Sequence, residues 1–222
     1  MESIKDDFDR KINEIEIFFE LLQNIESEEI CLKDNSILTD LNKILKASFF
    51  LMLYNMVEST MRESVIAIYD KIDSYGINFN QLGSRLRKKI LVDCKSNIGI
   101  DILHNGTSSD IAKELLKVSM SEKKLFSGNI DSELIKRTAL QYGFSYSTDP
   151  NRTKHGEKLR SIKDYRNDLA HGNLTFSEVG RSYDLNQLRE YKDETIAYVE
   201  KIIENIDYYL RNQRYLNNSN GQ

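Results

Sequence analysis

The chain has 222 residues, with 31 Lys and Arg against 35 Asp and Glu, and its formal net charge is −4. This length suits one domain, and a hydrophobic share of 40% is enough for a core that needs no disulfide staples. The net charge excludes a protein that is basic over its whole surface, although it leaves room for a local basic site.

Two long helices are predicted in the first 75 residues. In the first, about Ser3 to Ile25, apolar residues recur at helical spacing, at Ile4, Phe8, Ile12, Ile15, Phe18, Phe19 and Leu22. The second spans about Asn35 to Asp73, and its middle is apolar on nearly all sides, which is typical of a helix buried all round. Neither Gly nor Pro interrupts them before Gly76.

The middle of the chain is more broken, because nearly all the Gly residues and the only Pro fall between residues 76 and 180. Three short helices are predicted here, over Leu82 to Asp93, Asp110 to Val118 and Asp131 to Tyr142. Gly143 is the expected left-handed stop of the third. The residues from 144 to 153 are polar and irregular.

The C-terminal part again favours helices. Leu159, Ile162, Tyr165 and Leu169 share one face of a helix that Gly172 should end. A last long helix is predicted from about Asp184 to Leu216. No alternating strand pattern is present, so we predict an all-α protein. We expect one domain over residues 1–216, with shorter elements inserted at about 76–157 and a disordered tail at 217–222.

The sequence also points to a compartment. No apolar run reaches the roughly 18 residues of a membrane span, and Asp6, Asp7 and Asp9 stand where a signal peptide would be basic and then apolar. Two Cys residues are too few for a disulfide framework. We therefore expect a cytoplasmic protein that does not associate with membranes.

Arg166 and His171 are the residues best suited to chemistry. Arg166 falls about 50° from the centre of the apolar face of its helix, so it should be paired with a carboxylate or line a cleft. In a regular helix the two side chains point about 140° apart. Either the last turn is distorted, or a second chain supplies the missing partner. The plainer interpretation is a paired arginine and a histidine that complements the helix dipole.

The pattern Arg166-Asn167-x-x-x-His171 resembles the R-x(4–6)-H signature of the HEPN superfamily. The long helix at 49–72, the segment GNIDSELIKRTALQYGF at 128–144, the motif RNDLAHG and the following TFSEVGRSYDLNQL together resemble the MAE-like HEPN proteins. This resemblance implies a HEPN-type helical bundle and a metal-independent endoribonuclease without a cofactor. It also implies a homodimer with a composite site, and a role in bacterial defence or toxin–antitoxin systems beside an antitoxin or partner encoded nearby.

Such an enzyme needs a proton-transfer group and a fixed positive charge. Histidine as a residue type can accept and donate protons near neutral pH, so His171 suits the first task, and Arg166 suits phosphate binding and charge stabilisation. The expected products are a 2′,3′-cyclic phosphate and a 5′-hydroxyl. Asn167 could position the phosphate or hydrogen-bond His171. Glu58 could orient Arg166 or Arg62, or simply form an intrahelical pair with Arg62.

Basic residues near this motif are candidate contacts for RNA, namely Arg152, Lys154, Lys158, Arg160 and Lys163. A second basic run lies at 83–95. Tyr142, Phe144 and Tyr146 could stack on bases or pack internally. No metalloprotease or nucleotide-binding motif occurs. The alternative to a ribonuclease is a non-catalytic HEPN dimer that binds a partner protein or nucleic acid.

Overall fold

The computed structural model describes residues 1–30, 35–97 and 125–217. All the regular elements in these ranges are helices, and one isolated bridge pairs Leu82 with Leu216. The predicted all-α fold class is confirmed. No helix in the described ranges combines the length and the apolar character needed to span a membrane.

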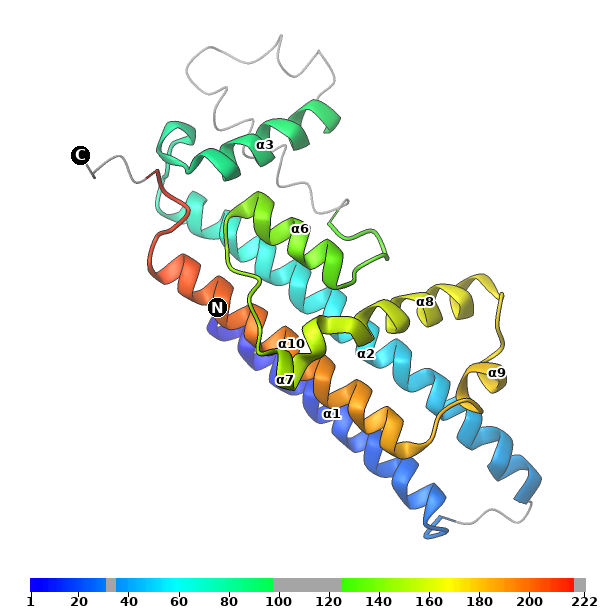
Figure 1. The fold of residues 1–222 in the computed structure, drawn as a ribbon. Helices are drawn as coiled ribbons and strands as arrows, with labels where there is room; N and C mark the ends of the chain where they lie inside the picture. Colours follow the sequence, from blue (N-terminus) through cyan, green and yellow to red (C-terminus); the bar gives the residue numbers. More distant parts are fainter. Residues whose placement is uncertain (31–34, 98–124, 218–222) are drawn as a thin grey trace.

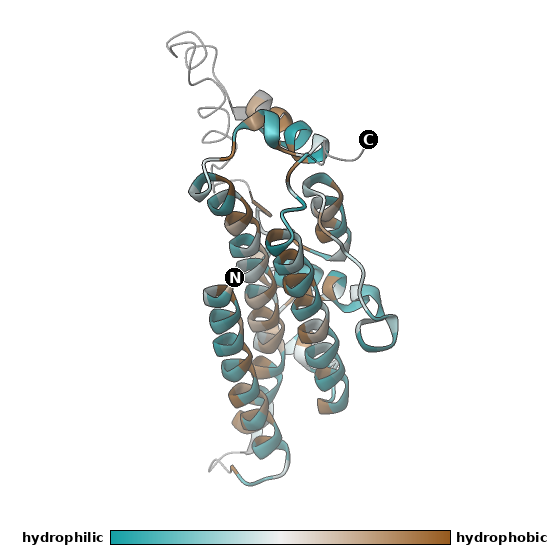
Figure 2. Cartoon of the chain, turned by 90° about the vertical axis from the view of Figure 1, so that its left-hand side faces the viewer, coloured by the Kyte–Doolittle hydropathy of each residue, from teal (hydrophilic) through white to brown (hydrophobic). Residues whose placement is uncertain are grey.

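Three long helices form the body of the molecule. They are α1 (Glu2–Glu26), α2 (Asn35–Ser74) and α10 (Leu185–Arg211), and they run side by side (Figure 1). The hydrophobic residues along these helices (Figure 2) contribute to one shared core. Phe49, Phe50 and Leu53 in the middle of α2 are fully buried, because α2 is covered by α1, α10, α8 and α9. The sequence pattern predicted this all-round burial, although Asn55 remains exposed.

The shorter elements lie around this body. After α2 come η1 (Phe79–Gln81) and α3 (Ser84–Asn97), and α3 contacts α6 (Ser132–Tyr142). Asp131 caps α6 by accepting a hydrogen bond from the Leu134 N–H, and Gly143 ends it with a φ of +95°. The helix predicted at 110–118 lies outside the described residues, as does the predicted tail except for residue 217.

The chain then passes through α7 (Pro150–Thr153) and η3 (Lys154–Gly156) into α8 (Glu157–His171) and α9 (Phe176–Gly180). The sequence pattern did not predict α9, because five residues are too few to show helical spacing. Gly180 lets α9 approach α2 closely, since a Cβ atom there would lie 1.8 Å from the Lys43 carbonyl oxygen.

The last helix ends earlier than predicted, at Arg211 instead of Leu216. Beyond it, Tyr215 is buried and its carbonyl accepts a hydrogen bond of 2.8 Å from the Gly83 N–H. Tyr215 is thus held against the start of α3. The buried apolar residues of all the long elements form one connected core. The division into one domain with an insertion stays a prediction.

Candidate functional site

Helix α8 carries the Arg166–His171 motif and packs on α2. Leu159, Ile162 and Leu169 are buried, as the predicted apolar face requires. The helix stays regular up to His171, and the chain leaves it at Gly172 with a φ of +72°. A distorted last turn, one of the two ways to bring Arg166 and His171 together, is therefore not present.

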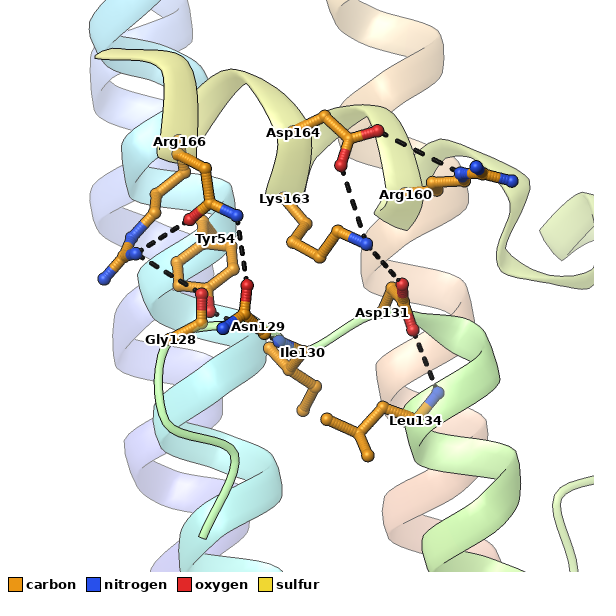
Figure 3. A network of polar contacts seen from close by, with 11 residues as sticks. Tyr54, Gly128, Asn129, Ile130, Asp131, Leu134, Arg160, Lys163, Asp164 and Arg166 are labelled. Atoms are coloured by element: carbon orange, nitrogen blue, oxygen red, sulfur yellow. Dashed lines mark hydrogen bonds and ion pairs between the residues drawn. The ribbon is translucent and has the colours of Figure 1, made fainter. Parts of the chain in front are cut away.

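Arg166 is half-buried and is held by neutral groups (Figure 3). Its guanidinium carbon lies 5.0 Å from the centre of the Tyr54 ring. Its Nη1 donates hydrogen bonds to the Asn167 Oδ1 at 2.9 Å and to the Gly128 carbonyl oxygen at 3.3 Å. Across residues 1–30, 35–97 and 125–217, no carboxylate lies within ion-pair distance of this guanidinium. The plainer interpretation, in which Arg166 forms an ion pair with a carboxylate of the core, therefore does not hold within these ranges.

A tight turn before α6 forms one wall of this site. Phe126, Ser127 and Gly128 have φ angles of +67°, +32° and +75°, a run of left-handed residues that brings the backbone close to Arg166. The Gly128 N–H donates to Glu58 Oε1 at 3.0 Å, and the Ile130 N–H donates to the Tyr54 hydroxyl at 3.4 Å. Glu58 and Tyr54 of α2 thus hold the turn, and the Gly128 carbonyl of the turn holds the Arg166 guanidinium.

The Glu58 carboxylate makes two contacts, one with Arg62 and one with the Gly128 turn. Its carboxylate lies 3.6 Å from Arg62, which is the intrahelical pair expected from their spacing. It also orders the Gly128 turn, so its influence on Arg166 passes through the backbone. Burial raises the pKa of Tyr54, the Ile130 hydrogen bond lowers it, and the charge of Glu58 raises it further. Tyr54 therefore stays a neutral phenol under the arginine at neutral pH.

His171 lies apart from this network. It is exposed in the last turn of α8, and its imidazole has no hydrogen-bond partner in the described part of the chain. Asn167 contacts Arg166 and the Asn129 Oδ1 rather than His171. Five helical residues separate the two motif side chains by a rise of about 7.5 Å and a rotation of about 140°. One chain thus presents the arginine and the histidine in different directions.

The five predicted RNA contacts do not form one uniform surface. Lys163 forms an ion pair of 2.6 Å with Asp131 (Figure 3), and Lys158 lies over the Tyr191 ring. Arg152, Lys154 and Arg160 are exposed. Burial favours a higher pKa for Asp131, but the hydrogen bonds from Lys163 and the Leu134 N–H outweigh it and lower that pKa. The Lys163 charge is thus already compensated within the chain.

Three residues of the site were not singled out from the sequence: Tyr54, Gly128 and Asn129. Tyr54 precedes Glu58 by one helical turn, so its position on the same face of α2 was a usable signal. The turn at 126–130 gave none, because its partners Glu58 and Arg166 lie 70 and 38 residues away. Among the described residues, no three His, Cys, Asp or Glu side chains are grouped to hold a metal ion.

A comparison with protein families finds a match to a model described as HEPN_MAE_28990-like HEPN, over residues 1–215. The match covers every described element from α1 to α10. Comparisons with curated proteins and with solved structures give no significant match.

Proposed function

Because the chain belongs to the HEPN_MAE_28990-like HEPN family, we propose that it is a metal-independent endoribonuclease that uses Arg166 and His171. The observation that carries the proposal is the partial burial of Arg166 without a carboxylate partner among the described residues. Its guanidinium is half-buried and rests on neutral partners. A cation that is partly removed from water and lacks a counter-charge is unfavourable. A phosphate of RNA would supply the missing anion and match the planar fork of the guanidinium.

In the proposed reaction the 2′-hydroxyl oxygen of the RNA attacks the adjacent phosphorus. The bond from phosphorus to the 2′-oxygen forms as the bond to the 5′-oxygen breaks. His171 takes the proton of the 2′-hydroxyl and gives it to the departing 5′-oxygen, so the proton count balances with one imidazole. Arg166 stabilises the negative charge that builds up on the phosphate oxygens. The products are a 2′,3′-cyclic phosphate and a 5′-hydroxyl.

We propose that the complete site needs two copies of the chain. The regular α8 turns Arg166 and His171 away from each other, so one copy does not direct both at one phosphate. A two-fold interface with α8 near the axis would place the histidine of one copy beside the arginine of the other. The exposed cations Arg152, Lys154 and Arg160, with Lys158, would contact the RNA backbone on either side.

The test is incubation of the purified chain with total RNA, with analysis of the ends that are produced. We expect cyclic phosphate and 5′-hydroxyl ends, no effect of EDTA, and loss of cutting in the His171→Ala and Arg166→Ala variants. Unchanged cutting in His171→Ala would overturn the assignment. RNA that is bound but never cut would favour the non-catalytic alternative.

A defence or toxin–antitoxin role makes a separate prediction. Expression of the wild-type chain alone should slow the growth of the host, and His171→Ala should relieve this effect. Coexpression with the product of an adjacent reading frame should also relieve it if that product is an antitoxin. Equal growth with the wild-type chain and with His171→Ala would contradict a role as a toxin.

A further inference from the structure

A candidate second site lies along α6, the helix that follows the turn that holds Arg166. A groove of about 870 Å³ runs between α6 and residues 143–150 and is also lined from α3, η3 and α10. We propose that this groove binds single-stranded RNA and guides the strand that leaves the Arg166 site. The proposal rests on the proposed ribonuclease function, and it adds a binding site that is separate from the reacting residues.

The charge of the groove suits a nucleic acid backbone. Arg85, Lys136 and Arg214 line it, and Glu133 is the one carboxylate that lines it within the described ranges. Lys136 lies 3.9 Å from this carboxylate. The lining therefore carries one acidic side chain and three basic ones. In a chain with a net charge of −4, such a local excess of positive charge attracts a polyanion.

The groove also offers an aromatic surface. Of the three aromatic residues that the sequence suggested for stacking, Tyr142 and Phe144 are buried, whereas Tyr146 is 40% exposed and lines the groove. The Lys136 Nζ lies 5.7 Å from the centre of the Tyr146 ring. An exposed ring beside a cation suits a stacked base and its phosphate. Ser145, Ser147 and Thr148 line the same groove, although the Ser145 Oγ accepts a hydrogen bond from the Ser147 N–H and the Thr148 hydroxyl contacts that of Thr153.

The groove and the Arg166 site are close along the chain. Ser132 lines the groove and follows Gly128, whose carbonyl contacts Arg166, by four residues. A chain of four residues spans at most about 14 Å. The proposal therefore requires a single RNA strand to bridge only a short distance between the two sites. Single-stranded RNA fits better than a duplex, because only unpaired bases can stack on a side chain such as Tyr146.

The test is a binding measurement that does not depend on cleavage. The probe is a fluorescent oligouridine of about 12 nucleotides, within the range that single-strand sites cover, with 2′-O-methyl groups that remove the attacking hydroxyl. We expect Tyr146→Ala to weaken binding at least about fivefold, the lower limit for one stacked base. Tyr146→Phe should bind like the wild type. Tyr75→Ala is the matched control, because Tyr75 is 57% exposed and lies outside the groove.

The cations are tested by salt dependence. Lys136→Ala should lower the slope of log K against log salt by about 0.7, the value for one phosphate contact of a single strand. Arg181→Ala, which removes an exposed arginine outside the groove, should leave the slope unchanged.

Three results would overturn the groove proposal: no effect of Tyr146→Ala, equal binding of duplex RNA, or equal competition by polyglutamate. If the groove variants behave as expected but the wild type never cuts RNA, the nuclease proposal fails, and the groove is an RNA-binding site without the guiding role. If cutting is observed and the groove variants bind normally, only the groove proposal fails.

Discussion

Replacement of Gly128 by alanine is a sharp test of how the turn controls Arg166. Gly128 has a φ of +75°, and a Cβ atom there would lie 3.0 Å from Nη1, 3.1 Å from Nη2 and 3.3 Å from Cζ of Arg166. The guanidinium would have to move by a few tenths of an ångström. That shift would weaken both its contact with the Gly128 carbonyl and its stacking on Tyr54.

The size of the effect follows from two contributions. A left-handed alanine costs about 1–2 kcal/mol relative to the favoured backbone region. Loss of one hydrogen bond and displacement of the arginine from the ring add about 1 kcal/mol. Gly76→Ala is the matched control, because Gly76 has a φ of +60° and a Cβ atom there would meet nothing within 4 Å. Gly128→Ala should therefore be the less stable variant by about 1 kcal/mol.

Urea unfolding followed by circular dichroism measures this difference, and RNA cutting measures its consequence. We expect Gly128→Ala to cut RNA at least about tenfold more slowly, as misplacement of a positioning group does, and Gly76→Ala to cut normally. In an Arg166→Ala background the two glycine variants should lose equal stability. Equal stability of the two variants with Arg166 present, together with normal cutting by both, would refute the reasoning.

Three further predictions concern the framework of the site. In the folded chain the pKa of Asp131 is lowered and the pKa of Lys163 is raised. Their ion pair therefore contributes its full stability at pH values above the pKa of an unfolded carboxyl group, about 4, and below the pKa of an unfolded lysine, about 10.4. The advantage of the wild type over Asp131→Asn in urea unfolding should therefore vanish as the pH falls through the lowered folded pKa of Asp131; an advantage that persists in acid would argue against the pair. Tyr54→Phe keeps the ring under the arginine and loses one of the two hydrogen bonds that hold the turn, so it should lose about 1 kcal/mol of stability and slow RNA cutting less than Gly128→Ala does, whereas cutting as fast as in the wild type would contradict a role of this bond in placing Arg166. Gly180→Ala should lower the free energy of unfolding by about 2–3 kcal/mol, because its Cβ atom would overlap the Lys43 carbonyl, and an unchanged urea midpoint would contradict the packing of α9 on α2.

Local patterns in the sequence predicted the helices well. The spacing of apolar residues located α1, α2, α6, α8 and α10, although it extended α10 beyond its end at Arg211, and Gly143 and Gly172 ended their helices as expected. The pattern did not show where α10 ends, because the bridge from Leu216 to Leu82 is a contact between distant parts of the chain.

The site was predictable only in part, because it also depends on contacts between distant parts of the chain. The position of Arg166 on the face of α8 indicated that it is not simply solvated. The partners that hold it come from α2 and from the 126–130 turn, which no local pattern connects to α8. The compensation of Lys163 was hidden too, because Asp131 lies 32 residues away.

Subunit complementation tests most directly whether two copies of the chain share one site. Arg166→Ala and His171→Ala are expressed separately and together, and RNA cutting is measured at equal protein concentration. Each variant alone should be inactive. The coexpressed pair should regain part of the wild-type cutting, because a mixed dimer combines the arginine of one copy with the histidine of the other. An inactive mixture beside an active wild type, or a monodisperse monomer that cuts RNA, would contradict the shared site.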